Sequence, residues 1–198
     1  MNVLLMKFPG LAVDRDRIAG MLRLGVPELD ACALDVMHAV DGVETYAYLE
    51  PLAAAGGPSL DTLRRIVAGQ LGALFPRASL LALRATLDLP GASADQPAPW
   101  HYVVETDVLP AAEDDFNQWY DTEHLPGLAA VPGTVRARRY LAADASPRYH
   151  AAYDLASRET FGSEPWLAVR ATDWSSRVRP NFTNTRRIMF KRADVQGN

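Results

Sequence analysis

Apolar residues follow two different spacings along the first half of the chain. Short apolar runs bounded by turn residues predict four strands, and apolar residues three or four positions apart predict two helices between them. The predicted strands are 3–8, 31–40, 44–49 and 80–89. The helices are expected to follow Asp14 and Ser59 or Asp61, because such side chains accept hydrogen bonds from the free N–H groups at a helix start. The order of these elements is β-α-β-β-α-β.

The second half repeats this order over a nearly equal length. Its predicted strands are 101–108, 134–142, 149–155 and a last one from Asn181. Its predicted helices run from Pro110 to Pro126-Gly127 and from Ser157, with interruptions at Gly162 and Pro165, to the run Arg177-Val178-Arg179-Pro180. We interpret that last run as a helix end. The two halves share almost no residue identity, so the repeat depends on the order and spacing of the elements alone.

A β-α-β-β-α-β unit is the ferredoxin-like split βαβ motif, an antiparallel sheet with both helices on one face. The other face is apolar and must be covered. Two such units in one chain cover each other sheet to sheet, and the barrel-like cavity between the sheets is the expected place for a small ligand. We therefore predict an α+β fold with a ferredoxin-like unit at 1–89, a linker of small residues and prolines at 90–99, and a second unit at 100–198.

Composition and charge narrow the classes of function. The chain has 198 residues, of which 48% are hydrophobic and 22% charged, as in an ordinary globular protein with its own core. The net charge of −4 argues against nucleic acid or an anionic membrane as a partner. No apolar run approaches the ~20 residues of a membrane span. The N-terminus also lacks the charged start of a signal sequence, so a cytoplasmic location is expected.

The densest run of aromatic and ionisable side chains is 113–127. Phe116, Tyr120 and His124 are four residues apart, so a helix places them on one face, with the histidine in the last turn before Pro126-Gly127. A histidine there is a candidate general acid or base because its ordinary pKa lies near 6.5. The alternative is a structural role, since the helix dipole stabilises a histidine cation at a helix C-terminus.

This stretch is followed by the turn Val131-Pro132-Gly133 and a strand that contains Arg138-Arg139-Tyr140. An aromatic helix that ends in histidine, a Pro-Gly turn and a strand together resemble the EthD-like proteins of the dimeric α/β-barrel superfamily, over residues 100–192. Members of that superfamily usually form their barrel from two chains. This chain resembles a fused pair with a degenerate first unit, whose helix near 17–24 has neither the aromatic pair nor the histidine. We expect the pair to build its own barrel, and a homodimer of such fused units stays open.

The resemblance implies a small apolar or aromatic acid or lactone as ligand in the cavity between the sheets, and no cofactor. It also implies a lyase, an isomerase or an oxygenase that uses a histidine for proton transfer. The predicted catalytic residues are His124, Tyr120 and Asp121, and the predicted ligand-binding residues are Trp119, Tyr140 and Arg138. A second hypothesis stays open, in which the chain is a non-catalytic ligand-binding or structural α/β barrel with Tyr120 and Trp119 as core aromatics.

Other motifs are excluded or left open by their spacing. His38, His101 and His150 lie on predicted strands without the local spacing of a metal site, and no metal is predicted. Gly56-Gly57 lacks the lysine and the strand-loop-helix context of a phosphate loop. Basic residues lie on two predicted strands, at 136–139 and at Arg186, Arg187, Lys191 and Arg192. Any of them that faces the cavity would bind a carboxylate through two hydrogen bonds, and a solvated sheet edge is the alternative.

Overall fold

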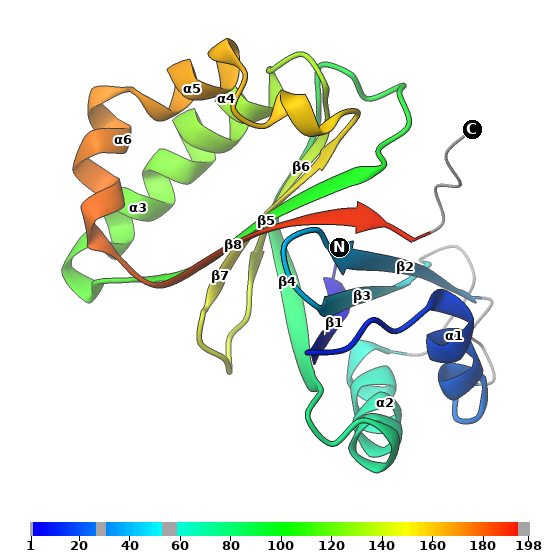
Figure 1. Ribbon diagram of the computed structural model, residues 1–198. Helices are drawn as coiled ribbons and strands as arrows, with labels where there is room; N and C mark the ends of the chain where they lie inside the picture. The colour runs from blue at the N-terminus through cyan, green and yellow to red at the C-terminus, as the bar shows by residue number, and fades with distance from the viewer. Residues whose placement is uncertain (1, 27–30, 53–58, 194–198) are drawn as a thin grey trace. The chain divides into compact units, whose positions relative to one another are not determined.

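The computed structural model describes residues 2–26, 31–52 and 59–193 (Figure 1), so Gly56-Gly57 lies outside the described residues. Internal contacts group the chain into two compact units. Unit 1 is Met1–Arg84 with Phe190–Asn198, and unit 2 is Ala85–Met189. The linker predicted at 90–99, between units at 1–89 and 100–198, stays a prediction.

The strands are β1 (Asn2–Pro9), β2 (Cys32–Ala39), β3 (Glu44–Pro51), β4 (Ser79–Pro90), β5 (Trp100–Val108), β6 (Thr134–Leu141), β7 (Tyr149–Leu155) and β8 (Phe182–Arg192). Within the described part of the chain they join in one closed order, β1-β3-β2-β8-β5-β7-β6-β4, through antiparallel pairs. Strands β4 and β8 have residues in both units. The predicted α+β barrel is confirmed.

The helices are α1 (Arg15–Arg23), α2 (Leu60–Leu74), α3 (Glu113–Trp119), α4 (Leu125–Ala129), α5 (Glu164–Arg170) and α6 (Asp173–Val178). Short turns are the 3-10 helices η3 (Pro110–Ala112), η5 (Arg158–Thr160) and η6 (Arg179–Asn181) and the π turn η4 (Tyr120–His124). The caps of the first two helices are confirmed, since the side chains of Asp14 and Ser59 accept from the N–H groups of Arg17 and Thr62. Among the described helices, none is long and apolar enough to cross a membrane.

Unit 1 packs its two helices against one face of its strands. The buried stripes of α1 and α2 include Ile18 and Leu63, both with no exposed surface. They join Leu4, Met6 and Phe8 of β1 in one core cluster. Because side chains alternate along a strand, these three residues share the face that the helices cover. Burial of these apolar side chains therefore holds the layer together.

The first helical stretch of unit 2 continues beyond its predicted end. The N–H of Leu125 donates to the carbonyl oxygen of Tyr120, five residues earlier, which makes the π turn η4 between α3 and α4. Pro126 then lies in the first turn of α4, where its missing N–H breaks no helical hydrogen bond. The predicted end at Pro126-Gly127 is wrong, because the π turn starts a new helical register just before the proline.

The second helical stretch of unit 2 is broken into short pieces. The interruption predicted at Gly162 and Pro165 is confirmed: the glycine has a positive φ of 85° and the proline opens α5. A further break follows α5, and Thr172 then caps α6 by accepting from the N–H of Ser175. Two short helices cover less of a sheet than one long helix does, which leaves room beneath them.

The segment after β4 is held within unit 2 by backbone hydrogen bonds. The N–H of Gly91 donates to the carbonyl oxygen of Val135 at 2.9 Å, and that of Ser93 to the carbonyl oxygen of Thr134 at 2.9 Å. A Cβ atom at Gly91 would lie 2.0 Å from the Thr134 carbonyl oxygen, so only glycine fits. These contacts anchor the start of β6.

Candidate functional site

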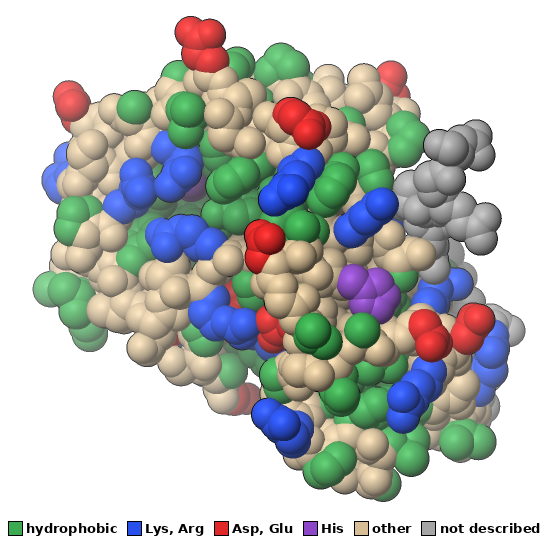
Figure 2. Space-filling view, viewed as in Figure 1, with side chains coloured by type: hydrophobic (Ala, Val, Ile, Leu, Met, Phe, Trp, Pro, Cys, Tyr) green, Lys and Arg blue, Asp and Glu red, His purple; other side chains and the backbone are tan. Residues whose placement is uncertain are grey.

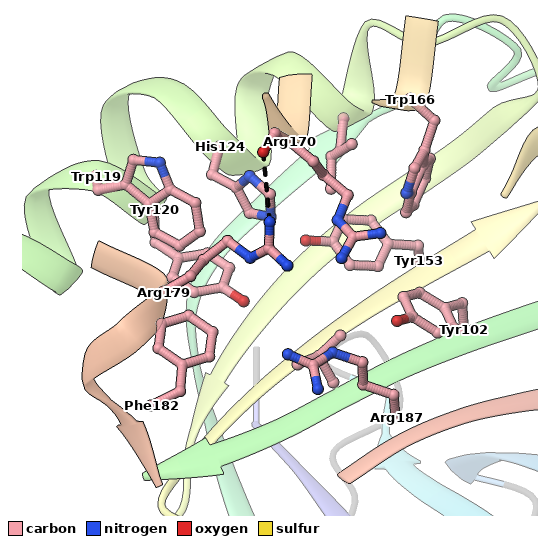
Figure 3. A pocket seen from close by; sticks show the side chains of 12 residues that line it. Tyr102, Trp119, Tyr120, His124, Tyr153, Trp166, Arg170, Arg179, Phe182 and Arg187 are labelled. Carbon is pink, nitrogen blue, oxygen red and sulfur yellow. Dashed lines mark hydrogen bonds between the residues drawn. The ribbon is translucent and has the colours of Figure 1, made fainter. Parts of the chain in front are cut away.

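A pocket lies between the helices and the sheet of unit 2, and all of its lining residues belong to that unit (Figure 3). Its aromatic lining is Tyr102, Trp119, Tyr120, Tyr153, Trp166 and Phe182. The other lining residues are His124, Arg170, Arg179, Arg187, Val104 and Leu128. The empty volume, with the part open to solvent, is about 370 Å³, and Figure 2 shows basic side chains around a hollow over this unit. Aromatic walls with a few convergent polar groups are typical of sites for small organic molecules.

This pocket lies on the helix side of the sheet, whereas the sequence placed the ligand on the side away from the helices. Tyr102 and Tyr153 belong to the same core cluster as α3, α4 and α5. Their neighbours His101 and Asp154 contact each other on the opposite face of the sheet. The broken helices and the π turn explain the difference, because a continuous helix pair would fill this layer.

His124 is buried in the wall of the pocket, with 7% of its surface exposed. Its ring stacks on that of Trp119, with 4.1 Å between centroids and 21° between planes, and meets the edge of the Tyr120 ring at 5.2 Å. Burial and the nearby charges of Arg170 and Arg179 lower the pKa of His124 to about 3. The imidazole is therefore neutral at physiological pH. Its Nδ1 atom has no hydrogen-bond partner among the described residues.

A carboxylate outside the pocket fixes the ring on which His124 stacks. The indole N–H of Trp119 donates to Glu123 Oε1 at 3.2 Å, and the hydroxyl of Thr172 donates to the same oxygen at 2.7 Å. Thr172 is also the N-cap of α6. The carboxylate of Glu123 thus ties the π turn to the start of α6 and sets the plane of the Trp119–His124 stack.

Two further buried polar atoms of the pocket wall have no partner in the described part of the chain. They are the hydroxyl oxygen of Tyr153 and the indole nitrogen of Trp166, in side chains with 1% and 0% exposure. Buried polar atoms normally form hydrogen bonds, so unpartnered ones mark places for water or ligand. Burial raises the pKa of Tyr120 to about 12 and that of Tyr153 well above its usual value. Both phenols therefore stay protonated and can donate.

The guanidinium groups of Arg170, Arg179 and Arg187 reach the pocket from α5, η6 and β8 (Figure 3). None of the three pairs with a carboxylate of the described residues. Arg179 Nη1 donates a hydrogen bond to the Arg170 carbonyl oxygen at 3.5 Å. Burial, followed by the charges of the other two arginines, lowers the pKa of Arg179. The pocket is thus electropositive.

The orientation of β8 depends on one residue in the left-handed region. Phe182 and Arg187 both line the pocket although they are five positions apart, which regular alternation forbids. Asn184 lies between them with a φ of 50°. This conformation lets the strand change the side on which its residues point. Arg187 therefore faces the pocket and Arg186 faces Glu105 at 3.9 Å on the other side.

The pocket brings together three of the six predicted site residues, which are Trp119, Tyr120 and His124. Asp121 pairs with Arg139 at 2.8 Å, and 48% of its side chain is exposed. Arg138 and Tyr140 share the face of β6 away from the helices, where the guanidinium of Arg138 contacts Asp154 Oδ2 at 2.7 Å. These last three residues do not line the pocket. Their functional roles stay predictions.

The sequence analysis does not single out Tyr102, Tyr153 or Arg170 as site residues, and it names Arg187 only as one of several basic residues whose face is open. The run that contains Arg179 was interpreted only as a helix end, and α6 does end at Val178, but the next residue turns into the pocket. Side chains alternate between the two faces of the sheet along β5 and β7, and this alternation is the sequence signal that could have placed Tyr102 and Tyr153. No local pattern of residues indicates the face of β8 on which Arg187 lies, because that face depends on the backbone at Asn184.

No family model matches the chain, and no curated protein matches it. Solved structures do. One is a candidate monooxygenase from Fusobacterium nucleatum, with a TM-score of 0.64, 9% identity and coverage of 98% of this chain and 92% of that one. Another is an anthrone oxidase-like protein, with a TM-score of 0.60, 14% identity and coverage of 99% and 94%.

A third structure is an uncharacterized ferredoxin fold protein from Listeria monocytogenes related to antibiotic biosynthesis monooxygenases. Its TM-score is 0.53, its identity is 10%, and 96% of this chain and 94% of that one are covered. The chain has the ferredoxin-like α+β barrel fold of these proteins. Identities this low show the fold alone, so function has to be argued from the pocket.

Proposed function

We propose that unit 2 binds a small aromatic compound in this pocket and that His124 takes a proton from it, in an oxygenase, a lyase or an isomerase that needs no cofactor. The observation that carries the proposal is the buried neutral imidazole in the pocket wall, stacked on Trp119 and with Nδ1 unpartnered among the described residues. Such a group accepts a proton from a substrate that lies against it. The EthD-like resemblance of residues 100–192 supports the same assignment.

The rest of the pocket suits the anion that proton removal creates. The guanidinium groups of Arg170 and Arg179 supply positive charge, and protonated phenols such as Tyr153 supply hydrogen-bond donors. A pKa of about 3 makes the free imidazole of His124 a weak base. Negative charge that develops beside it raises that pKa, so the imidazole gains basicity as the reaction proceeds.

Oxygenation is the reaction that the similar structures favour, since one is an anthrone oxidase-like protein and another a candidate monooxygenase. For an anthrone, His124 would remove one proton of the ring methylene. The resulting enolate carries the electrons that reduce O₂. Overall the methylene loses two hydrogens and four electrons, one oxygen atom becomes the new carbonyl, and the other leaves as water.

The test uses anthrone and anthrone-2-carboxylate with the full-length protein. Deuterium incorporation at the methylene under nitrogen reports proton transfer, and oxygen uptake in air reports oxygenation. His124→Gln is expected to lower the rate constant of deuterium incorporation by ~10²–10⁴-fold. His38→Gln, a matched substitution at a histidine of unit 1, is expected to change nothing. Equal exchange rates in wild type and His124→Gln would overturn the role of His124.

The second candidate function is ligand binding without catalysis, and the low pKa of His124 favours it. In that case the same aromatic probes bind, the methylene exchanges at the uncatalysed rate, and His124→Gln changes neither result. The two candidates share the pocket and differ only in proton transfer.

We also infer that the chain is a fused pair with one site. Both halves have the same order of strands and helices, and helix α1 has neither the aromatic pair nor the histidine of the second half. One ligand per chain is therefore the expected stoichiometry in calorimetry. Two ligands per chain would contradict a single site, and a homodimer would show as a doubled mass in light scattering.

A further inference from the structure

The three arginines of the pocket come from segments far apart in the sequence and converge on one space. Arg170 ends α5, Arg179 opens η6 and Arg187 lies on β8. Figure 3 shows their side chains reaching the volume that also contains Tyr102 and Tyr153. Three different elements thus place positive charge around the same pocket.

Six other arginines among the described residues of unit 2 have a carboxylate partner within the same unit. These pairs are Arg136–Asp88 at 2.6 Å, Arg138–Asp154 at 2.7 Å, Arg139–Asp121 at 2.8 Å, Arg148–Glu113 at 2.8 Å, Arg177–Asp115 at 2.9 Å and Arg186–Glu105 at 3.9 Å. The unit therefore has carboxylates available and uses them outside the pocket. Within the described ranges no carboxylate lines the pocket itself.

Like charges gathered without a counterion are unfavourable. Arg179 is the example in this pocket, because burial and then the charges of Arg170 and Arg187 lower its pKa. A bound anion relieves this repulsion and gains charge-assisted hydrogen bonds. Guanidinium groups suit a carboxylate best, since their planar N–H pairs match its two oxygens. The aromatic walls require that the rest of the ligand be flat and apolar.

We infer that the pocket is a receptor for an aromatic carboxylate, whose carboxylate group is bound by Arg170, Arg179 and Arg187 while its ring lies among the aromatic side chains. This inference rests on the pocket of the proposed function and names the charge of its ligand. The three unpartnered polar atoms of the wall, at His124, Tyr153 and Trp166, remain available for the other polar groups of the ligand.

The bound carboxylate also changes His124. Arg170 and Arg179 are charged groups that hold the pKa of the imidazole low, beside burial itself. A carboxylate between these arginines and the ring cancels their effect and stabilises the imidazolium. The base therefore gains strength only when the correct substrate is present, which links recognition to proton transfer.

The experiment is isothermal titration calorimetry of the full-length protein with 2-naphthoate and 2-naphthamide, which differ in charge and hardly in shape. At pH 7.5 and constant ionic strength, the naphthoate is expected to bind at least ~10-fold more tightly. Arg170→Gln, Arg179→Gln and Arg187→Gln are each expected to weaken naphthoate binding ~10-fold and to leave the amide unchanged. Arg177→Gln is the matched control, since that exposed side chain pairs with Asp115 instead.

Each outcome decides the inference. Equal affinities for the two probes, no binding of naphthoate, or an equal loss in Arg177→Gln would overturn it. Tighter binding of 2-naphthyl phosphate than of 2-naphthoate would also overturn it, in favour of a phosphate ester. Unfolding is not expected to obscure the result, because each substitution removes repulsion, and the thermal midpoint of every variant checks this.

The result separates this inference from the proposed function. Charge-selective binding together with unchanged deuterium exchange in His124→Gln supports the receptor and removes the catalytic role. Loss of exchange in His124→Gln together with equal binding of acid and amide does the reverse.

Discussion

The two faces of the sheet in unit 2 hold charge in opposite ways. On the face away from the helices, Asp154 accepts hydrogen bonds from both His101 and Arg138, at 2.7 Å each. On the helix face, Arg170 and Arg179 meet in the pocket with no carboxylate partner among the described residues. Charge that is satisfied inside the protein holds the fold, and charge left unsatisfied indicates a ligand from outside.

The largest expected effect is a loss of stability when the paired charges on the face away from the helices lose their carboxylate. Asp154→Asn leaves Arg138 and His101 with a buried neutral partner, and removal of one partner from a buried ionic group is expected to lower the free energy of unfolding by about 3–5 kcal/mol. Urea unfolding followed by circular dichroism measures it. Arg187→Gln on the helix face is the comparison, and no loss is expected there. A loss under 1 kcal/mol in Asp154→Asn would show that the two faces do not differ.

The next effect is the pH dependence of stability that comes from the buried histidine of the helix face. The pKa of His124 is about 3 in the folded chain and near 6.5 when unfolded, so between these values the unfolded state binds one more proton. Stability therefore falls as the pH falls through this window. Between pH 7.5 and pH 5 the wild type should lose about 2 kcal/mol more than His124→Gln does. Parallel pH profiles of the free energy of unfolding would contradict the buried neutral histidine.

A smaller effect is expected at the link between the π turn and α6. Thr172→Ala removes the N-cap of α6 and one hydrogen bond to Glu123, at a cost of about 1 kcal/mol. Ser163→Ala is the matched control, because that N-cap side chain makes no capping hydrogen bond and its buried oxygen is unpartnered among the described residues. Chemical denaturation should show a loss only for Thr172→Ala, and equal losses would refute the link.

The smallest effect is expected at a partly exposed ion pair on the face away from the helices. The pair between Arg136 and Asp88 is about one-third exposed at both residues, at 35% and 32%. Solvent screens such a pair, so Asp88→Asn is expected to cost about 0.5 kcal/mol or less at physiological salt. The cost should vanish near 1 M sodium chloride. A salt-independent loss of several kcal/mol would place this pair with the buried cluster of Asp154.

The sequence was sufficient for the order of elements and for the local part of the site. Strand alternation and helical spacing are short-range signals, and side chains such as Asp14 and Ser59 mark helix starts by a local hydrogen bond. Trp119, Tyr120 and His124 were found for the same reason, because one short helical stretch carries all three.

The rest of the pocket depends on contacts that no local pattern encodes. Its arginines come from α5, η6 and β8, and only the tertiary fold brings them together. The side on which Arg187 points is decided by the left-handed backbone of Asn184. The predicted cavity lies on the other face of the sheet, because the helices are expected to fill the face that they cover. The convergence of the arginines on the helix face therefore lay beyond the sequence argument.

The π turn makes the site depend on chain length as well as on residue identity. Compared with an α-helix, the stretch 120–124 holds one surplus residue, and the hydroxyl of Thr122 caps the loosened turn by donating to the carbonyl oxygen of Gln118 at 2.8 Å. In a regular helix the side chain at 124 would lie nearest the positions three and four residues before it. The wider turn places His124 over Trp119 instead, five residues before it, with 4.1 Å between the ring centroids. A related sequence that keeps both residues five positions apart in a regular helix would therefore lose a stack that residue matching reports as intact.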